Sequence, residues 1–205
     1  MLGQDGFDLW ADEYDKSVGL SDESNAYPFA GYRKILNRIY NDVLSSNAKR
    51  VLDIGFGTGT LTEKLYRHGC HIYGQDFSEK MLELALTKMP EAVLYQGDFS
   101  KGLVQPLMDK KYDAIIATYS LHHLPDERKV SFLKMLQGLL LEGGHIHIGD
   151  VAFETCRQLE VCREQAGDEW DDNEAYFVID DLKEQLPDLR FVAFSDCAGV
   201  IEIAK

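Results

Sequence analysis

The hydrophobic pattern of this chain becomes regular near residue 50. From there on, short apolar runs alternate with stretches in which apolar side chains recur every three or four positions. This alternation is typical of strands and helices that follow one another, and it predicts a largely parallel sheet covered on both faces. The predicted strands are residues 51–54, 71–76, 92–95, 112–117 and 145–148, and the predicted helices are residues 60–68, 78–88, 126–140, 154–166 and 177–186.

The two ends of the chain complete this picture. Residues 191–194 and 200–203 are apolar and flank a turn, so they predict a hairpin that closes the sheet. Residues 1–46 predict a helical cap, with Pro28 between two helical segments, and residues 47–205 predict the core. With 205 residues and no linker or repeat, we expect a single domain.

A glycine-rich turn follows the first predicted strand. It has the pattern Asp-x-Gly-x-Gly-x-Gly, formed by Asp53, Gly55, Phe56, Gly57, Thr58 and Gly59. Because side chains are nearly absent, a ligand can lie against the backbone beside the free N–H groups of the next helix. A dinucleotide site prefers G-x-G-x-x-G, and Thr60 stands where its third glycine would be.

Polar and aromatic residues follow the next three predicted strands. Asp76 and Phe77 end the second strand, about twenty residues after the first glycine, where a carboxylate can accept hydrogen bonds from ribose hydroxyls. The third strand leads into Asp98 and Phe99. The fourth leads into the segment 118–124, which contains Thr118 and the pair His122 and His123.

In this order and at these intervals, the motifs resemble the core of class I S-adenosylmethionine-dependent methyltransferases, from Val51 to about Val151. The segments 10–15, 31–32, 120–124 and 150–153 extend the resemblance to the small bacterial YrrT-like methyltransferases. The resemblance implies a Rossmann-like α/β fold, with a seven-stranded, mostly parallel sheet, an antiparallel C-terminal strand and the N-terminal helical cap. It also implies S-adenosyl-L-methionine as cofactor and S-adenosyl-L-homocysteine as product.

The same resemblance implies which residues bind the cofactor. Phe77 would lie on the adenine, Asp98 would read the adenine amino group, and Tyr14 and Tyr32 of the cap would lie near the methionine end. The implied cofactor-binding set is Asp53, Gly55, Phe56, Gly57, Thr58, Gly59, Asp76, Phe77, Asp98, Phe99, Thr118, Tyr14 and Tyr32.

Methyl transfer from a sulfonium needs no nucleophilic side chain of the protein. It is an in-line displacement, and positioning alone supplies about 7–11 kcal/mol of the barrier. A base is needed when the acceptor holds its proton tightly at neutral pH. His122 and His123 are the candidates to orient the acceptor or take that proton, and on an extended backbone only one of them would face the site.

The composition of the chain limits which molecules it is expected to bind and where it is expected to act. The net charge of −14 disfavours nucleic acid, so we expect a small-molecule methyl acceptor. No apolar run is long enough to span a membrane, and the N-terminus lacks the form of a secretory signal, so we expect a cytoplasmic protein. The four cysteines form no C-x-x-C pair, so no metal site is predicted.

The acidic segment 167–174, which includes Trp170, is interpreted as a solvated loop or a flap. The acceptor and the oligomeric state are left open. Two alternative functions also stay open: a non-catalytic binder of S-adenosylmethionine or S-adenosylhomocysteine, and a nicotinamide-dependent oxidoreductase.

Overall fold

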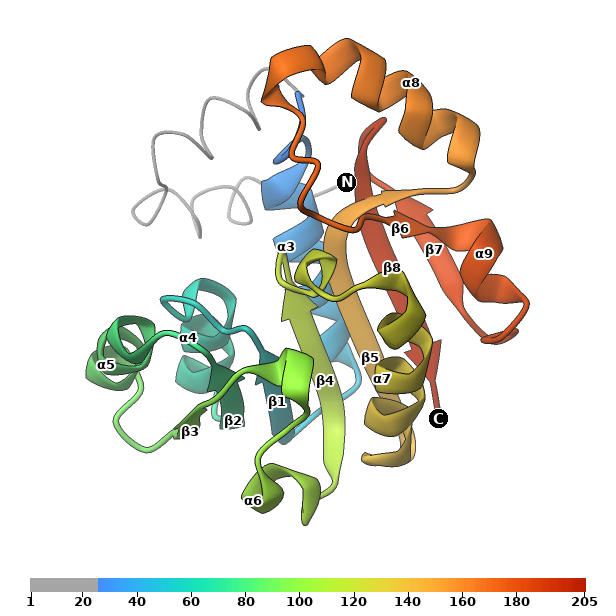
Figure 1. Ribbon diagram of the computed structural model, residues 1–205. Helices are drawn as coiled ribbons and strands as arrows, with labels where there is room; N and C mark the ends of the chain where they lie inside the picture. The colour runs from blue at the N-terminus through green and yellow to red at the C-terminus, as the bar shows by residue number, and fades with distance from the viewer. Residues whose placement is uncertain (1–25) are drawn as a thin grey trace.

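The computed structural model describes residues 26–205, and a mixed β-sheet runs through the middle of this part of the chain (Figure 1). Seven strands are arranged in the order β3-β2-β1-β4-β5-β8-β7, and the short β6 pairs with β5. The strands are β1 (Arg50–Ile54), β2 (His71–Asp76), β3 (Val93–Gln96), β4 (Tyr112–Thr118), β5 (Leu140–Phe153), β6 (Phe177–Val178), β7 (Arg190–Ala193) and β8 (Ala198–Ala204).

Strand β8 alone runs against its neighbours, since it pairs antiparallel with both β5 and β7, while the pairs among β1 to β6 are parallel. The order reverses between β1 and β4, so a crevice forms beyond the carboxyl ends of these two strands, where open α/β sheets bind ligands. The predicted Rossmann-like sheet with an antiparallel C-terminal strand is confirmed.

Helices cover both faces of the sheet. One face carries α3 (Tyr32–Ser45), α4 (Thr60–Arg67) and α5 (Glu79–Lys88), which form one apolar core with strand residues such as Val51, Ile72 and Ile116. The other face carries α6 (Gln105–Met108), α7 (Asp126–Gly138) and α9 (Ile179–Lys183), packed on residues such as Leu52, Ile115 and Ile146. Because alternate residues of β1 and β4 point to opposite faces, both strands are buried on both sides.

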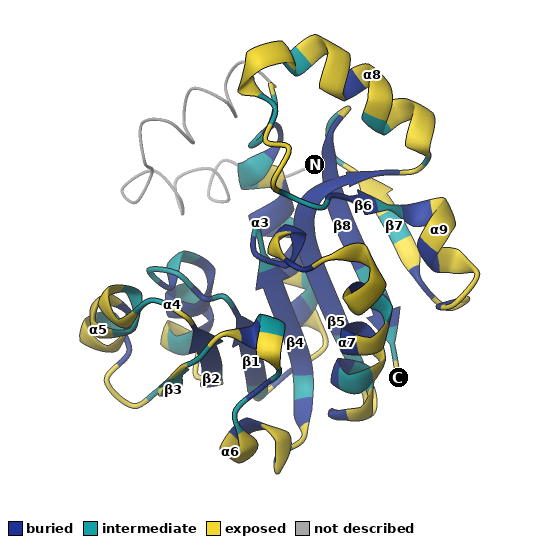
Figure 2. Cartoon of the chain, viewed as in Figure 1, coloured by how far each residue is buried: buried dark blue, intermediate teal, exposed yellow. Residues whose placement is uncertain are grey.

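One helix lies beyond the carboxyl edge of the sheet. Helix α8 (Cys156–Ala166) starts with a capping box, in which Thr155 and Gln158 satisfy each other's backbone N–H groups. The helix is exposed over most of its length (Figure 2). Short 3₁₀ turns are η1 (Phe99–Lys101), η2 (Leu121–His123) and η3 (Gly167–Glu169).

Two predicted elements differ from the structure. The helix predicted over residues 177–186 is the strand β6 followed by the shorter α9, because Phe177 and Val178 pair with the end of β5. The fifth strand is longer than residues 145–148, because β5 passes through Gly143 and Gly144 with an irregular register against β4. A Cβ on Gly144 would lie 2.9 Å from the Asp113 carbonyl oxygen, so close backbone approach, rather than a turn, requires this glycine.

The N-terminal part of the described chain reaches both the sheet face and its carboxyl edge. Helix α3 packs against β4, β5 and β8, with Ile35 and Ile39 directly over Gly149. The segment 26–31 before it reaches the carboxyl edge, where Ala30 packs with Val151 and Phe153. None of the helices in residues 26–205 combines the length and apolar character that a membrane span requires.

Candidate active site

The loop between β1 and α4 has its backbone bare and tightly bent. Gly55, Gly57 and Gly59 all have positive φ angles, of 70°, 54° and 76°. Only glycine adopts this region without strain. At Gly55 a second constraint applies, since an added Cβ would lie 2.5 Å from the Cβ of Ser120. The Ser120 hydroxyl donates to the Ile54 carbonyl at 2.7 Å, so the loop after β4 is held against the glycine loop.

Asp53 lies under this loop with its carboxylate fully buried. Thr62 of α4 donates to Oδ2 at 2.7 Å, while Oδ1 has no hydrogen-bond partner among residues 26–205. The pKa of Asp53 is raised to about 7, mainly by burial; the Thr62 hydrogen bond lowers it in part and the charge of Asp76 adds to the rise. The side chain also lines a cavity, and a donor or a cation that reached Oδ1 from there would supply the partner that this buried oxygen lacks.

Asp76 stands at the end of β2 and supports the loop. Its Oδ2 accepts from the Gly57 N–H at 2.8 Å and its Oδ1 from the Ser78 N–H at 2.9 Å. Each carboxylate oxygen can accept a further hydrogen bond. The ring of Phe77, which follows, is 67% exposed and free to stack on a ligand.

The cavity beside the glycine loop has a volume of about 210 Å³. Tyr32 and Tyr119 form one wall, with ring centroids 5.2 Å apart. Tyr119 has a φ of 50°, an uncommon conformation for a bulky residue that concentrates at functional sites. The cavity is lined by Tyr32, Leu36, Asp53, Gly55, Phe56, Gly57, Thr58, Thr60, Leu61, Thr118 and Tyr119.

The other predicted cofactor residues are placed differently. Phe56 and Phe99 are buried in the two cores, and Phe99 packs on Phe132 of α7. Asp98 is exposed at the end of β3, where hydrogen bonds from Ser100 and Lys101 lower its pKa. Tyr14 lies outside the described residues.

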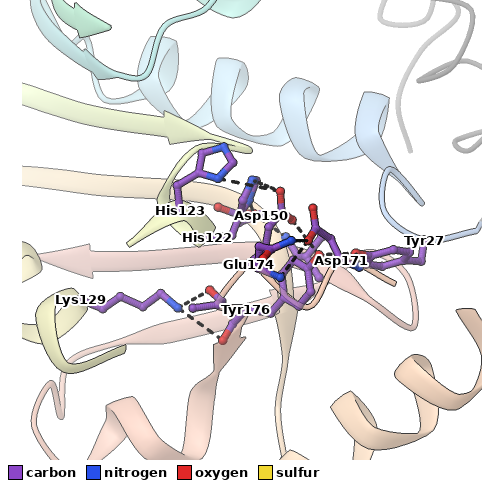
Figure 3. Close-up of polar contacts among 11 residues, drawn as sticks. Tyr27, His122, His123, Lys129, Asp150, Asp171, Glu174 and Tyr176 are labelled. Atoms are coloured by element: carbon purple, nitrogen blue, oxygen red, sulfur yellow. Dashed lines mark hydrogen bonds and ion pairs between the residues drawn. The ribbon is translucent and has the colours of Figure 1, made fainter. Parts of the chain in front are cut away.

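His122 pairs with a carboxylate that the sequence analysis did not select. Its Nδ1 is 2.6 Å from Oδ1 of Asp150 on β5, and both side chains are buried (Figure 3). Burial lowers the pKa of His122, but the charge and hydrogen bond of Asp150, with Glu174 nearby, raise it above its usual value overall. Asp150 also accepts from the Val151 N–H at 2.8 Å.

A second carboxylate, Glu174, faces both histidines. Its Oε1 is 3.4 Å from Nε2 of His122 and 3.9 Å from Nδ1 of His123. We expected the two rings to point in opposite directions, which holds for extended backbone, but residues 121–123 form the 3₁₀ turn η2. The rings are therefore close, with centroids 4.3 Å apart, and both approach Glu174.

Contacts from several elements fix the segment that carries Glu174. The Ala175 N–H donates to the His122 carbonyl at 2.9 Å, and buried Lys129 of α7 donates to the Ala175 carbonyl. Trp170 stacks on Tyr27 at 5.0 Å and meets Tyr176 edge-on at 4.8 Å. Segment 167–176 is therefore tied to the chain before α3 and does not leave its tryptophan in solvent.

Sequence reasoning missed Asp150, Glu174 and Tyr119. Asp150 comes shortly after the predicted strand 145–148, so a signal similar to that of Asp76 was available for it, although β5 in fact continues to Phe153. Glu174 is one of five acidic residues in the segment 167–174, which has no periodicity, so nothing in the sequence distinguished it from the others. The conformation of Tyr119 depends on its contact with the chain at Gly149, since its N–H donates to that carbonyl at 2.8 Å.

A larger cavity of about 440 Å³ lies between α8 and the β7–β8 hairpin. Its walls include Phe153, Arg157, Cys162 and Asp196, and none of its lining residues comes from the glycine loop or η2. Of these two cavities, the smaller one combines the bare backbone of the glycine loop with the unsatisfied carboxylate of Asp53.

Comparisons with known proteins agree with this geometry. Residues 51–144 match the family model described as "Methyltransferase domain". An uncharacterised methyltransferase of Geobacillus sp. (strain WCH70) is 40% identical over 161 residues, which cover 78% of this chain and 72% of the relative. One from Alkaliphilus oremlandii is 32% identical over 177 residues, 86% of this chain and 78% of the relative.

Solved structures share the fold at low identity. Magnesium protoporphyrin IX methyltransferase from Synechocystis with bound SAH has a TM-score of 0.69 and 20% identity, and the match covers 98% of this chain and 95% of that one. A S-adenosylmethionine-dependent methyltransferase from Clostridium acetobutylicum has a TM-score of 0.66 and 16% identity, over 93% and 98% of the two chains. On its similarity to the bacterial relatives, supported by this fold, the chain belongs to the methyltransferase family.

Proposed function

We propose that this methyltransferase moves the methyl group of S-adenosylmethionine to a small-molecule acceptor by in-line displacement. The acceptor's lone pair forms the new bond to the methyl carbon, the sulfur–carbon bond breaks, and its electron pair returns to sulfur to give S-adenosylhomocysteine. The family and the loop geometry support S-adenosylmethionine as the donor and speak against the nicotinamide-dependent oxidoreductase.

The unsatisfied Oδ1 of Asp53 is the observation that carries this proposal. A buried carboxylate oxygen without a partner among the described residues is costly unless a bound molecule supplies one. S-adenosylmethionine brings two positive charges, the ammonium of its methionine part and the sulfonium. Asp53 would hold the ammonium, and the bare backbone at Gly55 and Gly57, with the wall formed by Tyr32 and Tyr119, would hold the sulfonium end away from water.

The remaining predicted residues take roles consistent with their positions. The free lone pairs of Asp76 accept from the ribose hydroxyls, and Phe77 stacks on the adenine. Asp98 follows β3 and is exposed, and its carboxylate would accept from the adenine amino group. Phe56 and Phe99 contribute through the backbone they hold in place, because their rings are buried.

His122 and His123 stand on the acceptor side, where an imidazole orients the acceptor or accepts its proton. Thr118 and Tyr119 line the cofactor cavity, and η2 with the two histidines follows one residue later, after Ser120. The net charge of −14 favours a small acceptor over a nucleic acid.

Two measurements test the proposal. S-adenosylhomocysteine at about 100 times its dissociation constant should stabilise the folded protein by roughly 2.7 kcal/mol, whereas NADH should not. Transfer of labelled methyl to a metabolite extract should then occur with the wild type and fall in His122→Ala and His123→Ala. Stabilisation by NADH alone would refute the cofactor. Binding of S-adenosylhomocysteine without methyl transfer to any metabolite would indicate the non-catalytic binder instead.

A further inference from the structure

Three possible metal ligands from two distant segments meet at the acceptor side. His122 and His123 come from η2, and Glu174 comes from the segment before β6. One ligand atom of each lies within 4.8 Å of the other two (Figure 3). Two imidazoles and one carboxylate are a donor set that binds divalent transition metals with positions left open for a substrate.

The orientation of His122 requires a positive charge between it and Glu174. Its Nδ1 faces the Asp150 carboxylate at 2.6 Å, so Nδ1 carries a proton and donates it. In the neutral ring, the Nε2 lone pair then faces Oε1 of Glu174 at 3.4 Å. A lone pair aimed at a carboxylate oxygen is repulsive unless a proton or a metal ion lies between them.

The distances favour a metal ion over a proton. A charge-assisted N–H···O hydrogen bond is about 2.7–2.9 Å long, and 3.4 Å exceeds that range. Two ligand atoms that share one ion, each about 2.0–2.2 Å from it, lie roughly 2.9–3.4 Å apart. His123 Nδ1 lies 3.9 Å from the same oxygen, beyond this range, so the exposed His123 ring has to move closer for all three groups to bind one ion.

Outer contacts orient these ligands as they do in metal sites. Asp150 holds the ring of His122 from behind, an arrangement that raises the basicity of the ligating nitrogen. The Tyr176 hydroxyl donates to the second oxygen of Glu174, Oε2, at 2.7 Å, which leaves Oε1 facing the histidines. Lys129 fixes the backbone beside Glu174 through the Ala175 carbonyl.

A second cluster of acidic and histidine side chains differs from the first in having an arginine beside it. Asp42, His147 and Glu202 also lie close together, on the face covered by α3. There Arg38 supplies the positive charge, since its guanidinium is 2.5 Å from Asp42 and 3.8 Å from Glu202. Glu174 instead faces the two histidines and the Tyr176 hydroxyl, and no arginine or lysine side chain among the described residues forms an ion pair with it.

We propose that His122, His123 and Glu174 bind one divalent transition-metal ion. Two neutral imidazoles and one carboxylate leave a net charge of +1 on the bound ion, which suits an oxygen ligand in the open position. Resting on the proposed function, this site would hold an oxygen-bearing acceptor and lower the pKa of its hydroxyl, so that the hydroxyl releases its proton to solvent water before methyl transfer. The histidines then act on the acceptor through the ion.

Metal binding can be measured without any methyl donor or acceptor. Chelator-treated full-length protein is titrated with Zn²⁺ by calorimetry and with Co²⁺ by visible absorption, whose intensity reports the coordination. We expect one ion per chain. The variants His123→Ala and Glu174→Gln should weaken binding at least about 10-fold, and the positioning variant Asp150→Asn about 10–100-fold.

His71→Ala is the matched control, because it removes an exposed histidine at the start of β2 and should bind as the wild type does. Circular dichroism checks that each variant is folded; His123 is exposed, so its replacement leaves the core intact. Wild type that binds no ion would overturn the proposal, as would His123→Ala and Glu174→Gln variants that bind as tightly as His71→Ala. S-adenosylhomocysteine binding, measured separately, distinguishes failure of the metal site from failure of the methyltransferase function.

Discussion

Replacing Asp53 by asparagine should make the folded protein more stable at neutral and alkaline pH. Burial raises the pKa of Asp53 from 3.8 to about 7 in the folded protein. The folded state therefore binds this proton more tightly than the unfolded chain does, and its stabilising effect is complete below about pH 4 and is lost as pH rises through about 7. Asparagine resembles the protonated acid and keeps an oxygen that can accept from Thr62.

The size of the effect follows from the shift. A difference of one pKa unit corresponds to 1.36 kcal/mol, so the rise from 3.8 to about 7 corresponds to about 4 kcal/mol. The free energy of unfolding of Asp53→Asn, relative to wild type, should increase by about this amount between about pH 4 and pH 8. Asp76 is the charged neighbour that contributes to the shift, and Asp76→Asn should reduce it.

Urea unfolding at a series of pH values measures this difference. Asp168→Asn, which changes an exposed carboxylate of η3, is the control and should give a flat difference from wild type. A flat or falling difference for Asp53→Asn would refute the reasoning. The affinity for S-adenosylhomocysteine should fall while the stability rises. Asp53→Asn removes the negative charge that attracts the ammonium of the ligand. Methylthioadenosine, which lacks the amino acid part, should bind both proteins alike.

Three further predictions concern local structure. Gly55→Ala should lower the free energy of unfolding by about 2–4 kcal/mol, because the new Cβ adds backbone strain and overlaps with Ser120. Gly57→Ala should lower it by only about 1–2 kcal/mol, because its Cβ would point into open space. Urea unfolding measures both values. Trp170→Ala removes two ring contacts worth about 2 kcal/mol in total, so hydrogen exchange should increase in residues 167–176 and not in the sheet. Thr155→Ala should cost about 1 kcal/mol by removing the cap of α8, while Thr155→Ser keeps it, again by urea unfolding.

The sheet was predictable because its signals are local. Each parallel strand is a short apolar run, and the glycine loop and Asp76 could be located from their spacing along the chain. The type and length of an element could not be predicted from the sequence where long-range pairing decides them. Phe177 and Val178 form the strand β6 because the end of β5 lies beside them.

The acceptor side was predictable only in part. The histidine pair could be selected from its position after β4, but its partners could not. His122 meets Asp150 across 28 residues, and Glu174 approaches from a further loop whose acidic composition hides it. The turn type of η2 also mattered, because extended backbone would separate two rings that a 3₁₀ turn brings together.

The excursion from Glu154 to Tyr176 leaves β5 and comes back to the same strand, because β6 pairs with the last two residues of β5. An insertion or deletion inside it changes the size of a closed loop and leaves every other strand pair in register. Residues 154–176, which contain helix α8 and Glu174, can thus be replaced as one segment without disturbing the glycine loop. In a protein engineered for a new acceptor, this is the part of the chain where libraries should be placed.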